Sequence, residues 1–305
     1  MNKERIYQKI ARFHDKNYKL LLLIPLALLI FSLVYMVQFY EKNDALFNRD
    51  ISLTGGTSVT INDKINSEEL RQAISNKLEG VNVREVSDLI SREELAVIVE
   101  TKSGEAETRE VLEEFLGYEL TPENSSFEFS GETLSKGFYK QLLIAISVSF
   151  LLMSLVVFFQ FKSIVHSLAV IYSAFADIIM ALVVVNLLGI EISSAGIVAF
   201  LMLIGYSVDT DILLANKVLN RKGKSVNRVI FESFKTGMTM TFTSLFAVMA
   251  AFLIVGPFSS VLYQIFLIMM LGLSFDLMNT WLTNVSITKW HALHKESKSK
   301  KQNEN

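Results

Sequence analysis

The sequence predicts an α-helical polytopic membrane protein with six spans and a small α+β domain between the first span and the second. Three observations lead to this fold class. Hydrophobic residues make up 51% of the 305 residues, and they gather in long stretches with few or no charges. Uncharged stretches of about 20 residues match the roughly 30 Å hydrocarbon core of a bilayer. Residues 41–140 differ, because their apolar positions alternate between strand-like and helix-like periods.

Composition also argues against several classes of protein. A soluble globular enzyme is not expected, because the charged residues are concentrated between the apolar stretches. The absence of cysteine excludes disulfides, thiolate metal sites and cysteine nucleophiles. Three prolines and the lack of a low-complexity tract argue against general disorder.

The spans follow from the apolar stretches, taken in chain order. The first is too long for a cleaved signal peptide and lacks a small-residue cleavage site, so we expect a retained anchor. The uncharged run from Thr236 to Phe275 is long enough for two crossings, and Gly256-Pro257 marks the turn between them. The predicted spans are residues 20–40, 141–161, 163–190, 192–216, 236–256 and 261–288.

Lys and Arg residues set the predicted orientation, because short loops rich in these residues stay on the cytoplasmic side. They gather in the two tails, residues 1–19 and 289–305, and in the loop at residues 217–235. The turns on the other side of the membrane hold none. We therefore predict a multi-pass protein of the cell membrane with both termini in the cytoplasm and residues 41–140 outside.

The external segment is predicted to form a small mixed domain. A strand from Ile51 is interrupted by Gly55-Gly56, and Gly117 ends the second helix. The order strand, helix, strand, strand, helix, strand is that of the ferredoxin-like split motif, an antiparallel sheet with two helices on one face. The fold alone does not specify what such a domain binds. The elements are predicted at residues 51–61, 66–78, 81–89, 94–101, 106–116 and 125–131.

Four aspartates lie within the predicted spans. Asp177 is at the middle of the third span, Asp276 is near the middle of the sixth, and Asp209 and Asp211 lie toward the cytoplasmic end of the fourth. A carboxylate at such depth costs about 2.5–3.5 kcal/mol, so it usually faces a bundle interior or a wet cavity. Burial also favours the neutral carboxyl, which makes these acids candidate proton carriers. Asp209 and Asp211 lie on different faces of one helix, which leaves open which of them is functional.

Polar side chains near these acids predict a hydrophilic interior. On the sixth span they follow Asp276 at helical spacing as Asn279, Thr280, Thr283 and Asn284. On the fifth span a lysine precedes three threonines that share one face: Lys235, Thr236, Thr239 and Thr243. These groups either hold a water chain for protons or only hydrogen-bond neighbouring helices, and the second role is the more common one for Ser and Thr.

Three motifs are similar to signatures of one family. LTGGT follows the first span, AFADII surrounds Asp177, and IGYSVDTDILL begins at Ile204 in the fourth span. Together they resemble the SecF family, the smaller subunit of the SecD/SecF accessory complex of the protein-export translocon, within the RND superfamily of proton-driven transporters. The fourth-span motif has the archaeal form. The motif residues taken as candidate site residues are Gly55, Gly56, Gly205, Tyr206 and Ser207.

The chain departs from bacterial members of that family at two positions. The bacterial acid of the fourth span aligns with Thr210, which lies between Asp209 and Asp211. A bacterial arginine of the fifth span aligns with Thr236, which leaves Lys235 as the nearby cation. The resemblance also implies that six spans are half of an RND-type bundle of twelve, and hence that a SecD-type partner completes it.

The resemblance implies a non-enzymatic accessory subunit of the Sec machinery, which acts with SecD to promote polypeptide translocation with the proton gradient. The expected partners are a SecD-type subunit, the Sec translocon channel, the translocating polypeptide and the lipid bilayer. No cofactor, metal or nucleic acid is expected, because the four histidines lack metal-ligand spacing with acids and Gly55-Gly56 lacks the lysine of a phosphate loop.

Other functions compete with this one. An RND-type half that transports small molecules or ions, or a homo-oligomeric channel, would need more than one small external module. An intramembrane aspartyl protease would use two of the acids as a dyad, but its Gly-x-Gly-Asp motif is absent, and GYSVD stands in its place. A membrane scaffold for export factors would lack proton chemistry, and an export assay with an ionophore separates it from a motor.

Overall fold

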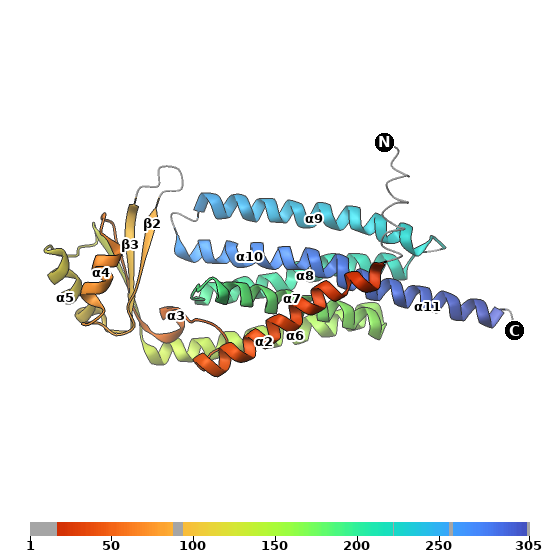
Figure 1. The fold of residues 1–305 in the computed structure, drawn as a ribbon, viewed down its shortest axis with the longest axis horizontal. Helices are drawn as coiled ribbons and strands as arrows, with labels where there is room; N and C mark the ends of the chain where they lie inside the picture. Colours follow the sequence, from red (N-terminus) through yellow and green to blue (C-terminus); the bar gives the residue numbers. More distant parts are fainter. Residues whose placement is uncertain (1–16, 88–93, 222, 256–258, 304–305) are drawn as a thin grey trace.

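The computed structural model describes residues 17–87, 94–221, 223–255 and 259–303. The molecule is elongated, with a four-stranded sheet at one end and a bundle of long helices along the rest of its length (Figure 1). Helix α2 (Leu23–Asn43) begins and helix α11 (Val285–Asn303) ends at the end of the bundle away from the sheet. The turn predicted at Gly256-Pro257 lies outside the described residues.

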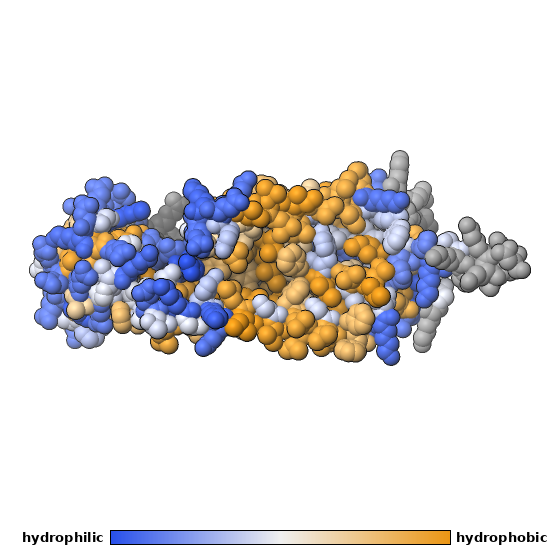
Figure 2. All heavy atoms as spheres, turned by 90° about the horizontal axis from the view of Figure 1, so that it is seen from below, coloured by the Kyte–Doolittle hydropathy of each residue, from blue (hydrophilic) through white to orange (hydrophobic). Residues whose placement is uncertain are grey.

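Within the described residues, six helical segments are long and apolar enough to cross a membrane, which confirms the predicted number of spans. Figure 2 shows a hydrophobic band across the middle of one face of the molecule, with hydrophilic residues toward both ends. The chain is therefore a multi-pass membrane protein. Its long helices are α2, α6 (Glu132–Phe161), α7 (Ile164–Leu187), α8 (Ser194–Leu219), α9 (Val226–Val255) and a continuous run of α10 (Ser260–Met278), the π-helix η1 (Asn279–Asn284) and α11.

Several helices extend beyond the predicted spans. Helix α6 begins at Glu132 and α9 begins at Val226, so most of the loop predicted at residues 217–235 is helical. Helix α11 likewise covers most of the predicted tail at residues 289–305. Lys, Arg and Glu are good helix formers, so a helix continues where its sequence turns polar. Hydropathy marks the apolar part of a helix and not its ends.

The sheet domain, residues 51–130, contains the six predicted elements in the predicted order. Its sheet has the order β2-β3-β1-β4 with every neighbouring pair antiparallel. Helices α4 and α5 pack on one face, where Leu70 and Leu112 meet Val59, Val97 and Val99 in a buried core. The elements are β1 (Gly56–Ile61), α4 (Ser67–Ile74), β2 (Asn82–Ser87), β3 (Glu94–Thr101), α5 (Glu105–Leu116) and β4 (Ser125–Ser130).

The strand predicted from Ile51 is wrong in its first half, because residues Ile51–Thr54 form a helical turn, α3. The Asp50 carboxylate caps this turn by accepting a hydrogen bond of 2.7 Å from the Ser52 N–H. Gly55 and Gly56 then have φ of 89° and 140°. A Cβ on Gly55 would lie 2.5 Å from Glu132 Cα, and one on Gly56 would lie 2.2 Å from the Thr101 carbonyl oxygen. Both glycines are needed for close backbone contacts and not for a continuous strand.

Helices α7 and α8 form the interior of the bundle. Their side chains are mostly buried, whereas α6 and α9 present many exposed apolar side chains. The main core cluster joins residues of α7, α8 and α10. Polar side chains on the inward faces of these three helices are therefore held away from both water and lipid.

Candidate functional site

Three carboxyl groups from separate helices meet in the interior of the bundle. Asp177 comes from α7, Asp211 from α8 and Asp276 from α10, and their relative exposures are 0%, 0% and 1%. We call these three residues the bundle cluster. The sequence predicted that such acids would face a protein interior, and the packing of α7, α8 and α10 brings these three together there.

The Asp177 carboxylate is held by two neutral donors. Ser207 Oγ of α8 donates to Asp177 Oδ2 at 2.6 Å, and Asn279 Nδ2 of η1 donates to Asp177 Oδ1 at 2.6 Å. Asp177 therefore ties α7 to both α8 and η1.

Thr280 connects the other two acids of the bundle cluster. Its Oγ1 lies 2.7 Å from Asp211 Oδ1 and 3.2 Å from Asp276 Oδ1. A threonine hydroxyl has one hydrogen, so it donates to one carboxylate only. The second contact becomes a hydrogen bond only when that carboxyl carries a proton and donates it to Thr280. The geometry thus has a place for one proton shared among Asp211, Thr280 and Asp276.

The π-helix η1 presents Asn279, Thr280 and Asn284 to this cluster. Asn279, Thr280, Thr283 and Asn284 are all buried, as the predicted stripe requires. π-helical turns are rare in proteins, and those that occur often lie at functional sites. Asn284, together with Ser173 of α7, lies beside the Asp211 carboxyl. Hydroxyl and amide groups from three helices therefore surround the acids.

The structure separates the two aspartates of α8. Asp211 points into the bundle, whereas Asp209 is exposed on the outer surface. The fourth-span motif divides in the same way, because Ser207 is buried against Asp177 while Gly205 and Tyr206 are exposed. This motif therefore supplies the Asp211 carboxyl and the Ser207 donor to the cluster, whereas its Tyr206 and Asp209 face outward.

The threonines of α9 do not reach the bundle cluster, contrary to the predicted interior position. Thr236, Thr239 and Thr243 are exposed, and each hydroxyl donates to a carbonyl one turn earlier in its own helix, at 2.7–3.1 Å. Thr236 also accepts a hydrogen bond of 3.2 Å from Lys217 of α8. Lys235 is exposed as well. These groups form a polar strip on the outside of α9.

Three residues of the site, Thr280, Asn284 and Ser173, were not among the candidate site residues. The sequence indicates Thr280 and Asn284 only as members of a polar stripe, and it does not single out Ser173. Thr280 follows Asp276 by four residues and Ser173 precedes Asp177 by four, so both share a helix face with an acid. That spacing is the signal in the sequence that identifies them.

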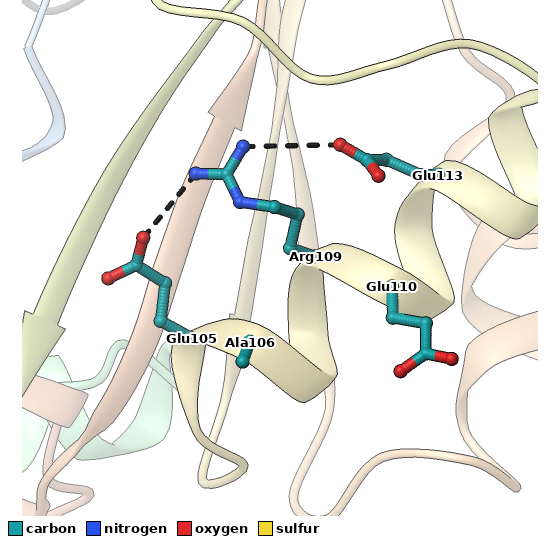
Figure 3. A pocket seen from close by; sticks show the side chains of 5 residues that line it. All are labelled: Glu105, Ala106, Arg109, Glu110 and Glu113. Atoms are coloured by element: carbon teal, nitrogen blue, oxygen red, sulfur yellow. Dashed lines mark hydrogen bonds and ion pairs between the residues drawn. The ribbon is translucent and has the colours of Figure 1, made fainter.

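The sheet domain has a hollow on the surface of α5, shown in Figure 3. Arg109 lies at its centre, with ion pairs of 3.4 Å to Glu105 and 4.0 Å to Glu113. Its guanidinium also donates to the Leu120 carbonyl at 2.6 Å and stacks on the Phe127 ring. These contacts explain Arg109 as a brace between α5 and β4.

The fold and the buried acids define a multi-pass membrane protein of six spans with a sheet domain after the first. Residues 111–294 match the family model described as protein export membrane protein SecD/SecF, C-terminal. The chain is 37% identical over 281 residues to the protein-export membrane protein SecF of Methanocaldococcus jannaschii, and the match covers 90% of this chain and 96% of that protein. It therefore belongs to the SecD/SecF family of protein-export membrane proteins, on the SecF side.

Other comparisons agree with this assignment. SecF of Haloquadratum walsbyi is 34% identical over 90% of this chain and 92% of that protein. SecF of Pyrococcus furiosus is 31% identical over 96% of this chain and 97% of that protein. The crystal structure of SecDF, a translocon-associated membrane protein from Thermus thermophilus, superposes with a TM-score of 0.74 at 21% identity. That match covers 89% of this chain but 37% of the SecDF chain, so it shows a shared fold over about a third of the longer protein.

Proposed function

We propose that this chain is the SecF-type half of a two-subunit export machine, that it pairs with a SecD-type membrane subunit, and that protons moving through the bundle cluster drive its cycle. The observation that carries the proposal is the single hydroxyl of Thr280 between two buried carboxyls. The proposed role is mechanical, with no reaction performed on the exported polypeptide.

Polar groups on the outer surface of the bundle support the pairing. Asp209, Thr239 and Thr243 are exposed on helices that are otherwise apolar enough to cross a membrane. A carboxylate facing lipid would cost about 2.5–3.5 kcal/mol, whereas a second subunit can supply polar partners. The match covers only 37% of the SecDF chain. The rest of that chain is long enough to correspond to a second subunit. We therefore assign the face of α8 and α9 to the SecD-type partner.

The bundle cluster supports the use of protons. Three ionised carboxylates at close range would repel strongly in a medium of low dielectric. The hydrogen bonds described above come from hydroxyl and amide groups of Ser207, Asn279 and Thr280, which add no positive charge. Binding one proton lowers this repulsion and completes the Asp211–Thr280–Asp276 chain. Releasing it breaks one of the two Thr280 contacts and favours a different packing of α8 against α10.

Contacts at the sheet end of the bundle give this repacking a route to the sheet domain. Gln264 of α10 accepts a hydrogen bond of 2.9 Å from the Ser193 N–H and donates to the Glu191 carbonyl. The Ile192 N–H in turn donates to the Asn48 carbonyl at 2.7 Å, just before α3. A shift of α10 relative to α7 and α8 would therefore move the loop to which the start of the sheet domain is bonded.

The proposed orientation puts both termini in the cytoplasm and the sheet domain outside, where an emerging polypeptide would be met. The basic tails favour this orientation, since short Lys- and Arg-rich segments stay inside. A proton that enters from outside then moves down the gradient, and one charge crossing 100 mV releases about 2.3 kcal/mol. That energy is comparable with the cost of one broken buried hydrogen bond.

The test is export of a reporter protein by Asp177→Asn and Asp211→Asn, each expressed with the SecD-type partner. We expect both to lower export at least about tenfold, to the level that the parent reaches with a protonophore. Asp44→Asn is the matched control, because Asp44 is an exposed carboxyl at the end of α2. Co-purification with a tag on this chain checks that each variant still recovers the partner.

Two outcomes would reject parts of the proposal. Parent-like export by Asp177→Asn and Asp211→Asn would eliminate the proton carrier, and the same export with and without the protonophore would favour a scaffold. Export that depends on an imposed sodium gradient and not on the proton gradient would show that sodium is the coupling ion. Failure to recover a second membrane subunit would reject the pairing.

A further inference from the structure

A second group of three carboxyls lies where the sheet domain meets the bundle. Asp50 caps α3, Glu100 is on β3, and Glu191 is in the loop between α7 and α8. One oxygen of each lies within 4.8 Å of the others. We call these residues the junction cluster. They come from three distant parts of the chain, so their proximity depends on the docked position of the sheet domain.

Two residues of β2 bind the junction cluster from the side of the sheet. Arg84 forms an ion pair with Glu100 and lies 4.0 Å from Asp50. Asn82 Nδ2 lies 3.3 Å from Glu100 Oε2 and 3.4 Å from Glu191 Oε2, so one amide bridges the sheet and the bundle. β2 is an edge strand of the sheet, and these contacts hold that edge against the α7–α8 loop.

The charges at this junction do not balance when every acid is ionised. The charged groups that act on Glu100 and Glu191 in the described part of the chain are Arg84 of β2, Asp50 before α3 and each other. One guanidinium therefore faces three carboxylates. Glu100 is buried at 4% exposure, which makes its ionised form the costly one.

We propose that the junction cluster is a pH-sensitive latch, which holds the β2–β3 edge of the sheet domain against the bundle while the cluster carries a proton and releases that edge when all three carboxyls are ionised. This goes beyond the proposed export function and does not rest on it. The proposed occupant is a proton and not a metal ion, because the Arg84 guanidinium already lies against Glu100 and 4.0 Å from Asp50.

The direction of the pH effect follows from proton binding. Burial raises the pKa of the Glu100 carboxyl from 4.5 to about 7, Arg84 opposes the rise, and Asp50 and Glu191 add to it. Burial also raises the pKa of Glu191. The docked state thus binds more protons than the released state between about pH 4.5 and 7. Docking is strongest below that window and changes little above it. As pH rises through the window, the docking equilibrium constant falls by up to roughly a few hundredfold for a full shift of the Glu100 pKa.

The test measures the distance between the sheet domain and the bundle in the full chain, purified in nanodiscs. The sequence has no cysteine, so Glu107→Cys on α5 and Val261→Cys on α10, both exposed, give two unique sites for spin labels. We expect one distance population at pH 5 and a second, longer population that grows on the order of tenfold or more by pH 8. Glu100→Gln, which mimics the protonated acid, should keep the single population at both pH values.

Two further variants and the parent serve as controls for the distance measurement. Glu128→Gln removes an exposed carboxyl in the same cross-strand row, since Ser58 pairs with both Glu100 and Glu128, and it should respond to pH as the parent does. Glu191→Gln repeats the test if Glu100→Gln does not fold. An unchanged distance from pH 5 to 8 in the parent overturns the latch. A pH response that survives in both Gln variants, or that disappears in Glu128→Gln, overturns it as well. None of these readouts requires export or the partner, so they are independent of the proposed function.

Discussion

The bundle cluster and the junction cluster each contain three carboxyls, but the groups that bind these carboxyls differ in charge. The bundle cluster is bonded by the hydroxyls of Ser207 and Thr280 and the amide of Asn279. The junction cluster has a full positive charge, Arg84, beside a buried glutamate. Where the donors are neutral, only a bound proton removes the negative charge of a buried carboxyl. A neighbouring cation balances that charge and lets the acid ionise near neutral pH. The contrast predicts one site that carries protons and another that only senses them.

The largest expected effect tests whether the sheet domain needs the close backbone contact between the start of β1 and the end of β3. Gly56→Ala would place a Cβ 2.2 Å from the Thr101 carbonyl oxygen at a φ of 140°. We expect the sheet domain to lose about 3 kcal/mol or more, because strain and a clash with rigid backbone add together. Hydrogen exchange of β1 and β3 in the full chain measures this.

Gly104→Ala is the matched control for that substitution. Gly104 precedes α5 with a φ of −68°, and a Cβ there would meet nothing within 4 Å. We expect a change below about 0.5 kcal/mol. Equal exchange protection in the two variants would contradict the close contact at Gly56.

The next effect sharpens the assignment of Thr280 in the bundle cluster. Thr280→Val keeps the shape of the side chain but removes the hydroxyl shared by Asp211 and Asp276. Loss of a hydrogen bond to a buried acid costs about 1–3 kcal/mol, so export with the partner should fall about tenfold or more. Thr280→Ser keeps a hydroxyl and should restore most of the activity. Export by Thr280→Val at the parent level would remove the hydroxyl from the proposed relay.

The smallest effect concerns the cation that distinguishes the junction cluster. Arg84 lowers the pKa of Glu100, so Arg84→Met should extend the loss of docking above pH 7 and make the total loss severalfold larger. The same pair of spin labels measures it. Lys77→Met is the control, since Lys77 pairs with Glu114 on the exposed surface of the sheet domain. An unshifted pH curve in Arg84→Met would mean that Arg84 does not set the balance of the cluster.

Local sequence patterns predicted much of the fold correctly. Apolar stretches predicted the number of spans, and period changes predicted the order of elements in the sheet domain. One helix end was also predicted correctly, since Gly117 follows α5 in the left-handed conformation with a φ of 76°. Each of these features depends on residues within a few positions of one another. Helix ends were less predictable, because charged helix formers carry a helix beyond its apolar part.

What the sequence determined by itself is which side chains cannot face lipid without a partner: the aspartates of the spans and the polar stripe after Asp276. Tertiary packing decided where each of them lies. It buried Asp211 and left Asp209 outside, and it placed the α9 threonines on the outer surface. It also joined Asp50, Glu100 and Glu191 across the chain. Periodicity gives a face relative to its own helix, but which face turns inward depends on how the neighbouring helices pack.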